Sequence, residues 1–230
     1  MFLSNLVIDA HNRKVRRELH APYELHRTLM NAYPYARAAN RCDLLFRVES
    51  HRAGPPTLLV QTRDDPAGWS NLPAGYLLHE PDCKPLELAV AVGQRLRFRL
   101  RANPTKRVAA ANERLGAVMA GKRVALHTEA DQLRWLLHKA ELSGFRIPGE
   151  WLPATSAAGD ATDLSPDFRV EVVTEGRDRN GKPGHGGEFL AVRFEGVLVV
   201  TDADRFQSTI STGIGSAKAF GFGLLSVAPG

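Results

Sequence analysis

Hydrophobic and polar positions in the first 92 residues alternate in a way that predicts short strands and two helical pieces. The first helix is expected to begin at Pro22, which suits a first helical turn, and to bury Leu25 and Leu29 until Pro34 interrupts it. A shorter helical or irregular piece is expected around Trp69. Strands are expected at Phe2–Asp9, Cys42–Glu49 and Thr57–Thr62, with a last extended segment near Tyr76–Leu78 or Leu86–Val92. The order β-α-β-β-α-β is the ferredoxin-like pattern, an antiparallel sheet with its helices on one face.

The same pattern starts again after residue 92. Helices are expected at Glu129–Ser143, which Gly144 ends, and at Asp202–Thr212, which opens with an acid where the helix dipole favours one. Strands are expected at Gln94–Ala102, Lys122–His127, Phe168–Thr174, Glu188–Val200 and Phe220–Val227. Residues 152–166 are expected to form a mobile loop, and residues 176–187 a charged, turn-rich connection. The sequence therefore predicts an α+β protein of two tandem ferredoxin-like (RRM-like) domains, at residues 1–92 and 93–230.

Composition places this chain among ordinary folded proteins. Of its 230 residues, 43% are hydrophobic and 24% are charged, which excludes disorder, collagen and a disulfide scaffold. No stretch approaches the roughly 18 uninterrupted apolar residues of a membrane span, and the N-terminus lacks the basic region of a signal peptide. Cys42 and Cys83 are not in a Cys-x-x-Cys pair and are expected to be reduced. A soluble cytoplasmic protein without a membrane partner is predicted.

Positive charge is concentrated in the first half of the chain. Residues 1–115 carry 18 basic and 11 acidic side chains, against 12 and 14 in residues 116–230. Because alternate residues of a strand face opposite sides, the strand at 94–102 is expected to gather four arginines on one face, with Lys106 and Arg107 continuing the charge. These arginines are Arg95, Arg97, Arg99 and Arg101. They indicate either a strand that binds the phosphates of a nucleic acid or a charged edge that prevents aggregation.

A glycine-rich segment lies near the C-terminus. Gly213, Gly215, Gly221 and Gly223 stand within eleven residues, together with Ser216 and Lys218. The segment is neither a Walker A loop nor a dinucleotide fingerprint, because the spacing of its glycines fits neither motif. A backbone that allows close approach, with a lysine inside it, is suited to phosphate contacts. The alternative is a plain turn followed by a strand.

A third candidate site lies on the first helix. Tyr23, His26 and Arg27 are spaced to share a helical face opposite Leu25 and Leu29. A phenol, an imidazole and a guanidinium suit phosphodiester chemistry, since one group can move a proton near neutral pH and another can meet developing negative charge. Taken alone, the triplet also fits a surface histidine on an amphipathic helix. No spacing of Cys, His or carboxylates resembles a metal site, so no metal or cofactor is expected.

Three motifs in this order are more specific than any one of them. They are Tyr23-Glu-Leu-His26-Arg-Thr-Leu, Arg97-Phe-Arg-Leu-Arg-Ala-Asn-Pro-Thr-Lys-Arg107 and Gly213-Ile-Gly-Ser-Ala-Lys-Ala-Phe-Gly-Phe-Gly-Leu-Leu-Ser226. In this combination the chain resembles the CasE family, the CRISPR RNA-processing endoribonucleases of type I-E systems. The resemblance covers nearly the whole chain and is weakest at residues 144–187.

The resemblance implies two tandem ferredoxin-like domains and cleavage of precursor CRISPR RNA at the base of the repeat hairpin, without a metal. The RNA 2′-OH would attack the adjacent phosphate and leave a 2′,3′-cyclic phosphate and a 5′-OH. It further implies that the product is retained and that the chain joins the multisubunit surveillance complex called Cascade. The family's catalytic histidine corresponds to His26 and its assisting tyrosine to Tyr23. At a helix N-terminus, the dipole would favour the uncharged form of His26.

Two other classes of function stay open from the residues alone. A non-catalytic RRM-like RNA-binding protein would need only the basic strand and the glycine-rich loop. RRM modules usually stack bases on sheet aromatics, however, and Phe98 is expected to point away from the arginine face. A subunit that binds only protein would leave the row of arginines unexplained.

Overall fold

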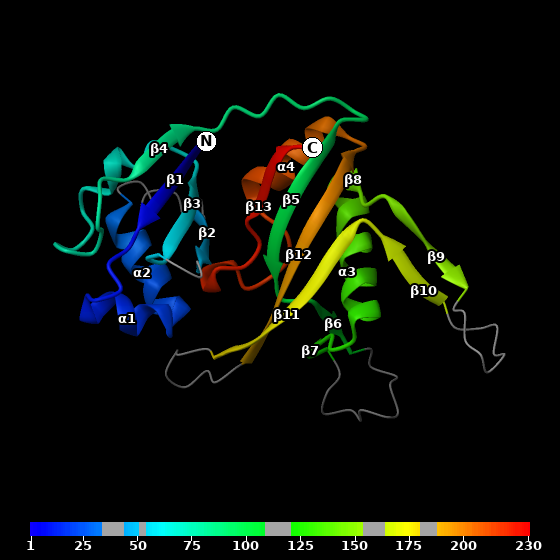
Figure 1. Ribbon diagram of the computed structural model, residues 1–230, viewed down its shortest axis with the longest axis horizontal. Helices are drawn as coiled ribbons and strands as arrows, with labels where there is room; N and C mark the ends of the chain where they lie inside the picture. The colour runs from blue at the N-terminus through cyan, green and yellow to red at the C-terminus, as the bar shows by residue number, and fades with distance from the viewer. Residues whose placement is uncertain (34–43, 51–53, 109–120, 154–163, 180–187) are drawn as a thin grey trace.

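The computed structural model describes residues 1–33, 44–50, 54–108, 121–153, 164–179 and 188–230, and it shows two antiparallel sheets side by side (Figure 1). The strands of the first sheet stand in the order β2-β3-β1-β4. They are β1 (Phe2–Val7), β2 (Leu44–Glu49), β3 (Thr57–Thr62) and β4 (Asp82–Pro85). Two helices, α1 (Arg13–Leu19) and α2 (Pro22–Ala32), follow β1, and a 3₁₀ turn, η1 (Ala67–Trp69), precedes β4.

The second sheet repeats this arrangement. Its strands β5 (Arg95–Ala102), β11 (Val170–Arg179), β12 (Glu188–Val200) and β13 (Leu225–Pro229) stand in the order β11-β12-β5-β13, and β8 (Phe145–Arg146) also pairs with β12. The helices are α3 (Glu129–Leu142) and α4 (Ala203–Thr212). In both sheets the first and third strands lie in the centre, which is the ferredoxin-like order. The predicted fold class is therefore confirmed.

Three smaller elements lie outside the two sheets. The strands β6 (Thr105–Arg107) and β7 (Arg123–Ala125) form one hairpin, and β9 (Gly149–Pro153) and β10 (Leu164–Phe168) form another. The glycine-rich segment contains the short turn η3 (Lys218–Phe220). No helix among the described residues is long and apolar enough to cross a membrane.

Several predicted elements need correction. Residues 152–166 are not all loop, because β9 and β10 pair from Gly149 opposite Phe168 to Pro153 opposite Leu164. The connection predicted at 176–187 begins later, because a register shift at Gly176 lets β11 continue to Arg179. The central part of each, 154–163 and 180–187, lies outside the described residues. The last strand begins at Leu225, and β4 lies between the two segments predicted for it.

Helix α1 is not predicted by the apolar pattern, because only Val15 and Leu19 in it are apolar. Its N-terminus is capped by Asn12, whose side-chain oxygen accepts from the amide of Lys14 at 2.9 Å. Near its C-terminal end, the buried carboxylate of Glu18 anchors the helix to the rest of the domain.

Glu18 ties α1 to the helix that carries the candidate catalytic residues. Its carboxylate accepts hydrogen bonds from Thr28 of α2 at 2.8 Å and from the hydroxyl of Tyr76 at 2.7 Å, and it pairs with Lys14 at 2.6 Å. Burial and the bond to Glu18 raise the pKa of the Tyr76 phenol, so Tyr76 stays a donor. A buried carboxylate with three partners fixes α2 on the first sheet.

The two sheets are joined by polar side chains of the first. Arg47 on β2 is only 3% exposed, and its guanidinium donates to the carbonyls of Arg99 at 3.3 Å and Leu224 at 3.2 Å and to the hydroxyl of Ser226 at 2.9 Å. Gln61 on β3 donates to the carbonyl of Ile210 at 2.7 Å. Since these acceptors belong to β5, β13, α4 and the segment before β13, the two sheets are held in one arrangement.

Candidate active site and nucleic-acid interface

Helix α2 carries Tyr23 and His26, both partly buried, beside its fully buried leucines Leu25 and Leu29. The Tyr23 and His26 ring centroids are 6.5 Å apart. Tyr23 stacks on Phe220 of the glycine-rich loop at 5.6 Å, and His26 stacks on Phe46 of β2 at 6.1 Å. The two predicted catalytic side chains therefore lie between the first sheet and the glycine-rich loop.

The environment of His26 favours its neutral form. Its Nδ1 atom is buried, and no hydrogen-bond partner for it exists among the described residues. Burial lowers the pKa of the His26 imidazole below its ordinary value of 6.5. The sequence predicted this direction from the helix dipole, whereas the cause found in the structure is desolvation. At neutral pH the imidazole is uncharged and able to accept a proton.

Arg27, the third predicted residue of this helix, is exposed and pairs with Glu24 on the same helix at 3.1 Å. Its guanidinium is thus engaged along the helix surface, with 59% of the side chain exposed. A role for Arg27 in RNA binding stays a prediction.

Strand β5 shows the predicted alternation, with Leu96, Phe98 and Leu100 buried and the arginines on the other face. Two of these arginines are paired with carboxylates of the protein itself. Arg99 pairs with Glu49 at 2.9 Å and with Glu195, its neighbour on β12, at 2.8 Å. Arg101 pairs with two carboxylates of β11, Glu175 at 2.7 Å and Asp178 at 2.9 Å.

The other two arginines of the row remain available. Arg95 and Arg97 are exposed, and neither forms an ion pair with any part of the chain that the structure describes. The arginine face is therefore divided, with one half open to a polyanion and the other half neutralised by carboxylates of the protein.

The neutralised half opens into a cleft of about 480 Å³ between the two sheets. Arg99, Arg101 and Arg193 line it together with Glu49, Glu175 and Asp178, and Phe46, Phe220 and Gly221 form its wall towards α2. The guanidinium of Arg101 also lies 4.6 Å from the centroid of the Phe222 ring. The cleft thus borders the aromatic rings on which Tyr23 and His26 stack.

The glycines of the loop at 213–223 are required by the protein's own packing. Gly213, Gly215, Gly221 and Gly223 all have positive φ, which side chains other than glycine rarely adopt. A Cβ at Gly213 would lie 2.8 Å from the carbonyl oxygen of Gly223, and one at Gly221 would lie 3.2 Å from Phe46. The groups that come close to the backbone of this loop are therefore other residues of the protein.

The side chains of the loop point to different surroundings. Lys218 donates to the carbonyl of Thr212, at the C-terminal end of α4, where the helix dipole favours a cation. Gly215 and Ser216 line a second pocket described below. Contacts of this loop with phosphate stay a prediction.

Replacing Gly213 by alanine should lower the free energy of unfolding by roughly 1–3 kcal/mol, because the new Cβ meets the Gly223 carbonyl and the Leu45 side chain at positive φ. Gly93→Ala is the matched control, since Gly93 also has positive φ but a Cβ added there would meet nothing within 4 Å. Urea denaturation of both variants separates the free-energy cost of a side chain at positive φ from the cost of the steric contact made by the new Cβ. Equal losses in the two would contradict a packing role for Gly213.

A basic pocket of about 370 Å³ lies where the β6–β7 hairpin, α3 and the glycine-rich loop meet. Its described lining residues include four basic side chains and no acid; the basic ones are Arg107, Arg123, His138 and Lys139. Asn103 is buried beside them, and its Oδ1 atom has no hydrogen-bond partner among the described residues. The cations of this pocket suit a polyanion, and the unpartnered acceptor suits one that also carries a hydrogen-bond donor such as a hydroxyl group.

The sequence predicted only part of this pocket. Arg107 was a candidate, and its neighbour Lys106 is also exposed on β6. Arg123 stands opposite Arg107 in the hairpin, and His138 and Lys139 lie one turn after Trp135 on α3. The pairing of β6 with β7 is the signal that would have found Arg123.

The three predicted motifs come together at the glycine-rich loop. Phe220 contacts Tyr23 of the first motif, Gly221 lines the cleft with Arg99 and Arg101 of the second, and Gly215 lines the pocket with Arg107. Within the described ranges, no group of three or more His, Cys, Asp or Glu side chains is placed to hold a metal ion.

Comparison with known proteins agrees with this arrangement over the full length of the chain. A family model described as CRISPR associated protein matches residues 1–229. The chain is 43% identical to the CRISPR-associated endoribonuclease Cse3 of Thermus thermophilus and 32% identical to the CRISPR system Cascade subunit CasE of Escherichia coli, in each case over 100% of both chains. The solved structure of Thermus thermophilus Cse3 bound to an RNA representing a pre-cleavage complex has a TM-score of 0.78 at 39% identity, covering 99% of this chain and 98% of that one.

Proposed function

We propose, since this chain belongs to the CRISPR associated protein family, that it is an endoribonuclease that cleaves precursor CRISPR RNA at the base of the repeat hairpin. The products would carry 2′,3′-cyclic phosphate and 5′-OH ends, and the protein would retain the hairpin. The observation that carries the proposal is a neutral, partly buried His26 beside Tyr23, at the edge of a cleft lined by guanidinium groups. The relatives named as endoribonucleases support it.

Each group has a defined task in this reaction. His26 takes the proton of the RNA 2′-OH, whose oxygen forms the new bond to phosphorus as the bond from phosphorus to the 5′-oxygen breaks. The departing 5′-oxygen takes a proton from solvent water and leaves as a hydroxyl. A phenol is a poor base near neutral pH and a good hydrogen-bond donor, so Tyr23 stabilises negative charge on the phosphate or the leaving oxygen. Cationic side chains around the cleft hold the phosphate in line for the attack.

The alternative is a non-catalytic RRM-like RNA-binding protein. Phe98 is 4% exposed and lies on the core side of β5, so the arginine face offers no base-stacking ring at that position. The pairing of an imidazole with a phenol is also unexplained by binding alone. Both observations favour the endoribonuclease.

Incubating a repeat-hairpin RNA with the protein in EDTA should give cleavage at the undiminished rate, because the nucleophile is the RNA's own 2′-OH and the proton acceptor is His26. The cyclic phosphate end is identified by mass spectrometry of the upstream product. Hairpin RNA that is bound but intact would support the alternative, and inhibition by the chelator would show that a metal-bound water takes part.

Replacing Arg97 by alanine should weaken hairpin binding and reduce the slope of log affinity against log salt by about 0.7–0.9, the contribution of one phosphate contact. The exposed Arg97 is chosen because, unlike Arg99, it can be removed without leaving carboxylates unpaired. Arg205→Ala is the control, because Arg205 pairs with Asp202 at the start of α4, and α4 packs against the core face of β5 rather than its arginine face. An unchanged slope in the Arg97 variant would place this strand off the RNA path.

We propose that the chain assembles with the other subunits of a type I-E surveillance complex, because the Escherichia coli relative is named as a Cascade subunit. We also propose that the protein acts in the cytoplasm, where precursor RNA is available.

We propose two domains, residues 1–92 and 93–230. The boundary lies within the segment that links β4 to β5 (Figure 1).

A further inference from the structure

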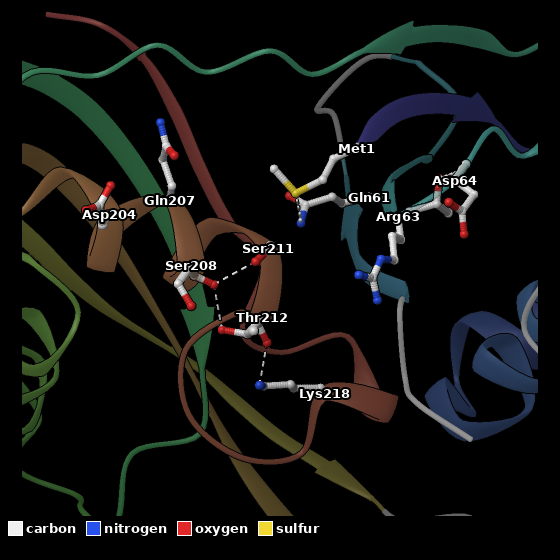
Figure 2. A pocket seen from close by; sticks show the side chains of 11 residues that line it. Met1, Gln61, Arg63, Asp64, Asp204, Gln207, Ser208, Ser211, Thr212 and Lys218 are labelled. Atoms are coloured by element: carbon white, nitrogen blue, oxygen red, sulfur yellow. Dashed lines mark hydrogen bonds between the residues drawn. The ribbon is translucent and has the colours of Figure 1, made fainter. Parts of the chain in front are cut away.

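A groove of about 910 Å³ is lined in part by Lys218 of η3, two residues from Phe220, which lines the arginine cleft. One wall is α4, the other is formed by Met1 and the end of β3, and Lys218 of η3 lies at its lower end in the close-up view (Figure 2). The bond from Gln61 to the carbonyl of Ile210 joins the two walls and fixes their separation.

The groove presents cations and hydroxyl groups. Arg63 extends from the end of β3 and Lys218 from η3, while Ser208, Ser211 and Thr212 line the α4 wall (Figure 2). The hydroxyls of Ser211 and Thr212 each donate to the carbonyl of Ser208 at 2.8 Å, which leaves the lone pairs of both oxygens to accept. None of the described residues that line the groove is aromatic.

Two carboxylates also line the groove, so its two cations are matched by two acids. Asp204 lies in the first turn of α4, and the backbone amide of Asp64 donates to the Tyr33 hydroxyl at 3.0 Å. In Figure 2 Asp204 lies at the left of the view and Asp64 at the right, beside Arg63. Arg63 and Lys218 are the groups of the groove that suit a phosphate.

The groove adjoins the candidate active site. Lys218 and Phe220 belong to the same short turn, and Phe220 stacks on Tyr23. The turn that contacts Tyr23 is therefore the same turn that supplies Lys218 to the groove.

We propose that the groove binds single-stranded RNA flanking the hairpin, through its ribose-phosphate backbone and without reading its bases. The inference rests on the proposed function. Arg63 and Lys218 would take phosphates, and the hydroxyl oxygens of Ser211 and Thr212 would accept from ribose 2′-OH groups. Without an aromatic ring to stack on, the contacts are independent of base identity.

The test compares a repeat hairpin that ends one nucleotide beyond the scissile phosphate, here called the unflanked hairpin, to the same hairpin carrying about six further nucleotides on the 5′ side or on the 3′ side, a length within the range that one single-strand site covers. A 2′-deoxy nucleotide at the scissile position keeps each RNA intact during binding measurements. One of the two extensions should tighten binding by roughly three- to tenfold and steepen the salt dependence by about 0.7 per phosphate bound. The arm that responds identifies which flank lies in the groove.

Arg63→Ala should remove that gain while leaving the affinity for the unflanked hairpin unchanged, since Arg63 is exposed and lies outside the arginine cleft. Arg205→Ala, on the same helix as the hydroxyl row but paired with Asp202, should retain the gain. The groove proposal is overturned if the extension does not raise the affinity of the unmodified protein. It is also overturned if the increase in affinity persists in Arg63→Ala or depends on the base sequence of the flank. Cleavage of the unflanked all-ribose hairpin is measured in parallel, and its absence would instead overturn the proposed function.

Discussion

His26→Ala should slow single-turnover cleavage of the hairpin by roughly 10²–10⁴-fold, the usual contribution of a general acid or base, with hairpin affinity nearly unchanged. In the proposed mechanism the imidazole moves a proton in the transition state, whereas affinity is expected to come from phosphate contacts spread over the arginine strand and the basic pocket. His26→Asn is a useful second variant because it keeps a polar side chain that cannot serve as a base. Cleavage at the normal rate in both variants would place the active site elsewhere.

The pH dependence of the same reaction tests the form in which His26 acts. Because burial lowers the pKa of His26, the imidazole of the free protein is already neutral at pH 7 and gains its proton only below its ordinary value of 6.5. For a base, kcat/KM should therefore fall as the pH drops through that lowered pKa and stay level from about pH 7 to 8. A decline of kcat/KM as the pH rises from about 6 to 8 would show that His26 acts as the acid instead.

Arg47→Met should lower the free energy of unfolding by about 3–5 kcal/mol, because it removes one partner of a buried charged network and leaves the others unsatisfied. Glu49 and the carbonyls of Arg99 and Leu224 would lose their donor at the junction of the two sheets. Arg47→Lys should give an intermediate loss, since an ammonium keeps the charge but cannot reach all of these acceptors.

Urea denaturation followed by tryptophan fluorescence measures the loss, with Arg205→Met as an exposed control expected to stay within about 0.5 kcal/mol of the unmodified protein. A single transition that splits into two in Arg47→Met would show directly that this arginine couples the sheets. A change below about 1 kcal/mol, with the cooperativity intact, would contradict that role.

Elements governed by local patterns were predictable from the sequence. The bounds of β3 and α2 agree with their predictions because each has an uninterrupted apolar period with clear ends, and Pro22 and Asp202 mark helix starts by their own chemistry. Helix α1 was not predicted because a buried acid, Glu18, stands where an apolar residue would be expected. Its three partners are polar groups that no hydrophobic pattern includes.

The arginines of β5 were predictable from the sequence, and the carboxylates that pair with two of them were not. The alternation of Arg95 to Arg101 is visible in one strand, whereas Glu175 and Asp178 lie 74 and 77 residues from Arg101 along the chain. Only the register of β12 against β5 brings Glu195 opposite Arg99. In the same way, the spacing of the glycines predicted that other groups lie close to the backbone of the loop. Which groups these are, such as Phe46 beside Gly221, became known only from the fold.

The paired arginines have a consequence for selectivity among the nucleic acids of a cell. Arg99 and Arg101 already hold carboxylates, so a phosphate that enters the cleft must displace Glu49, Glu195, Glu175 or Asp178 and leave that carboxylate to be solvated again. A transcript that touches the surface at random gains little from such an exchange, because like charges are brought together in the process. An RNA whose shape delivers several phosphates at once can open all the pairs together. The internal carboxylates would thus reject the abundant wrong ligands, at the cost of some affinity for the right one.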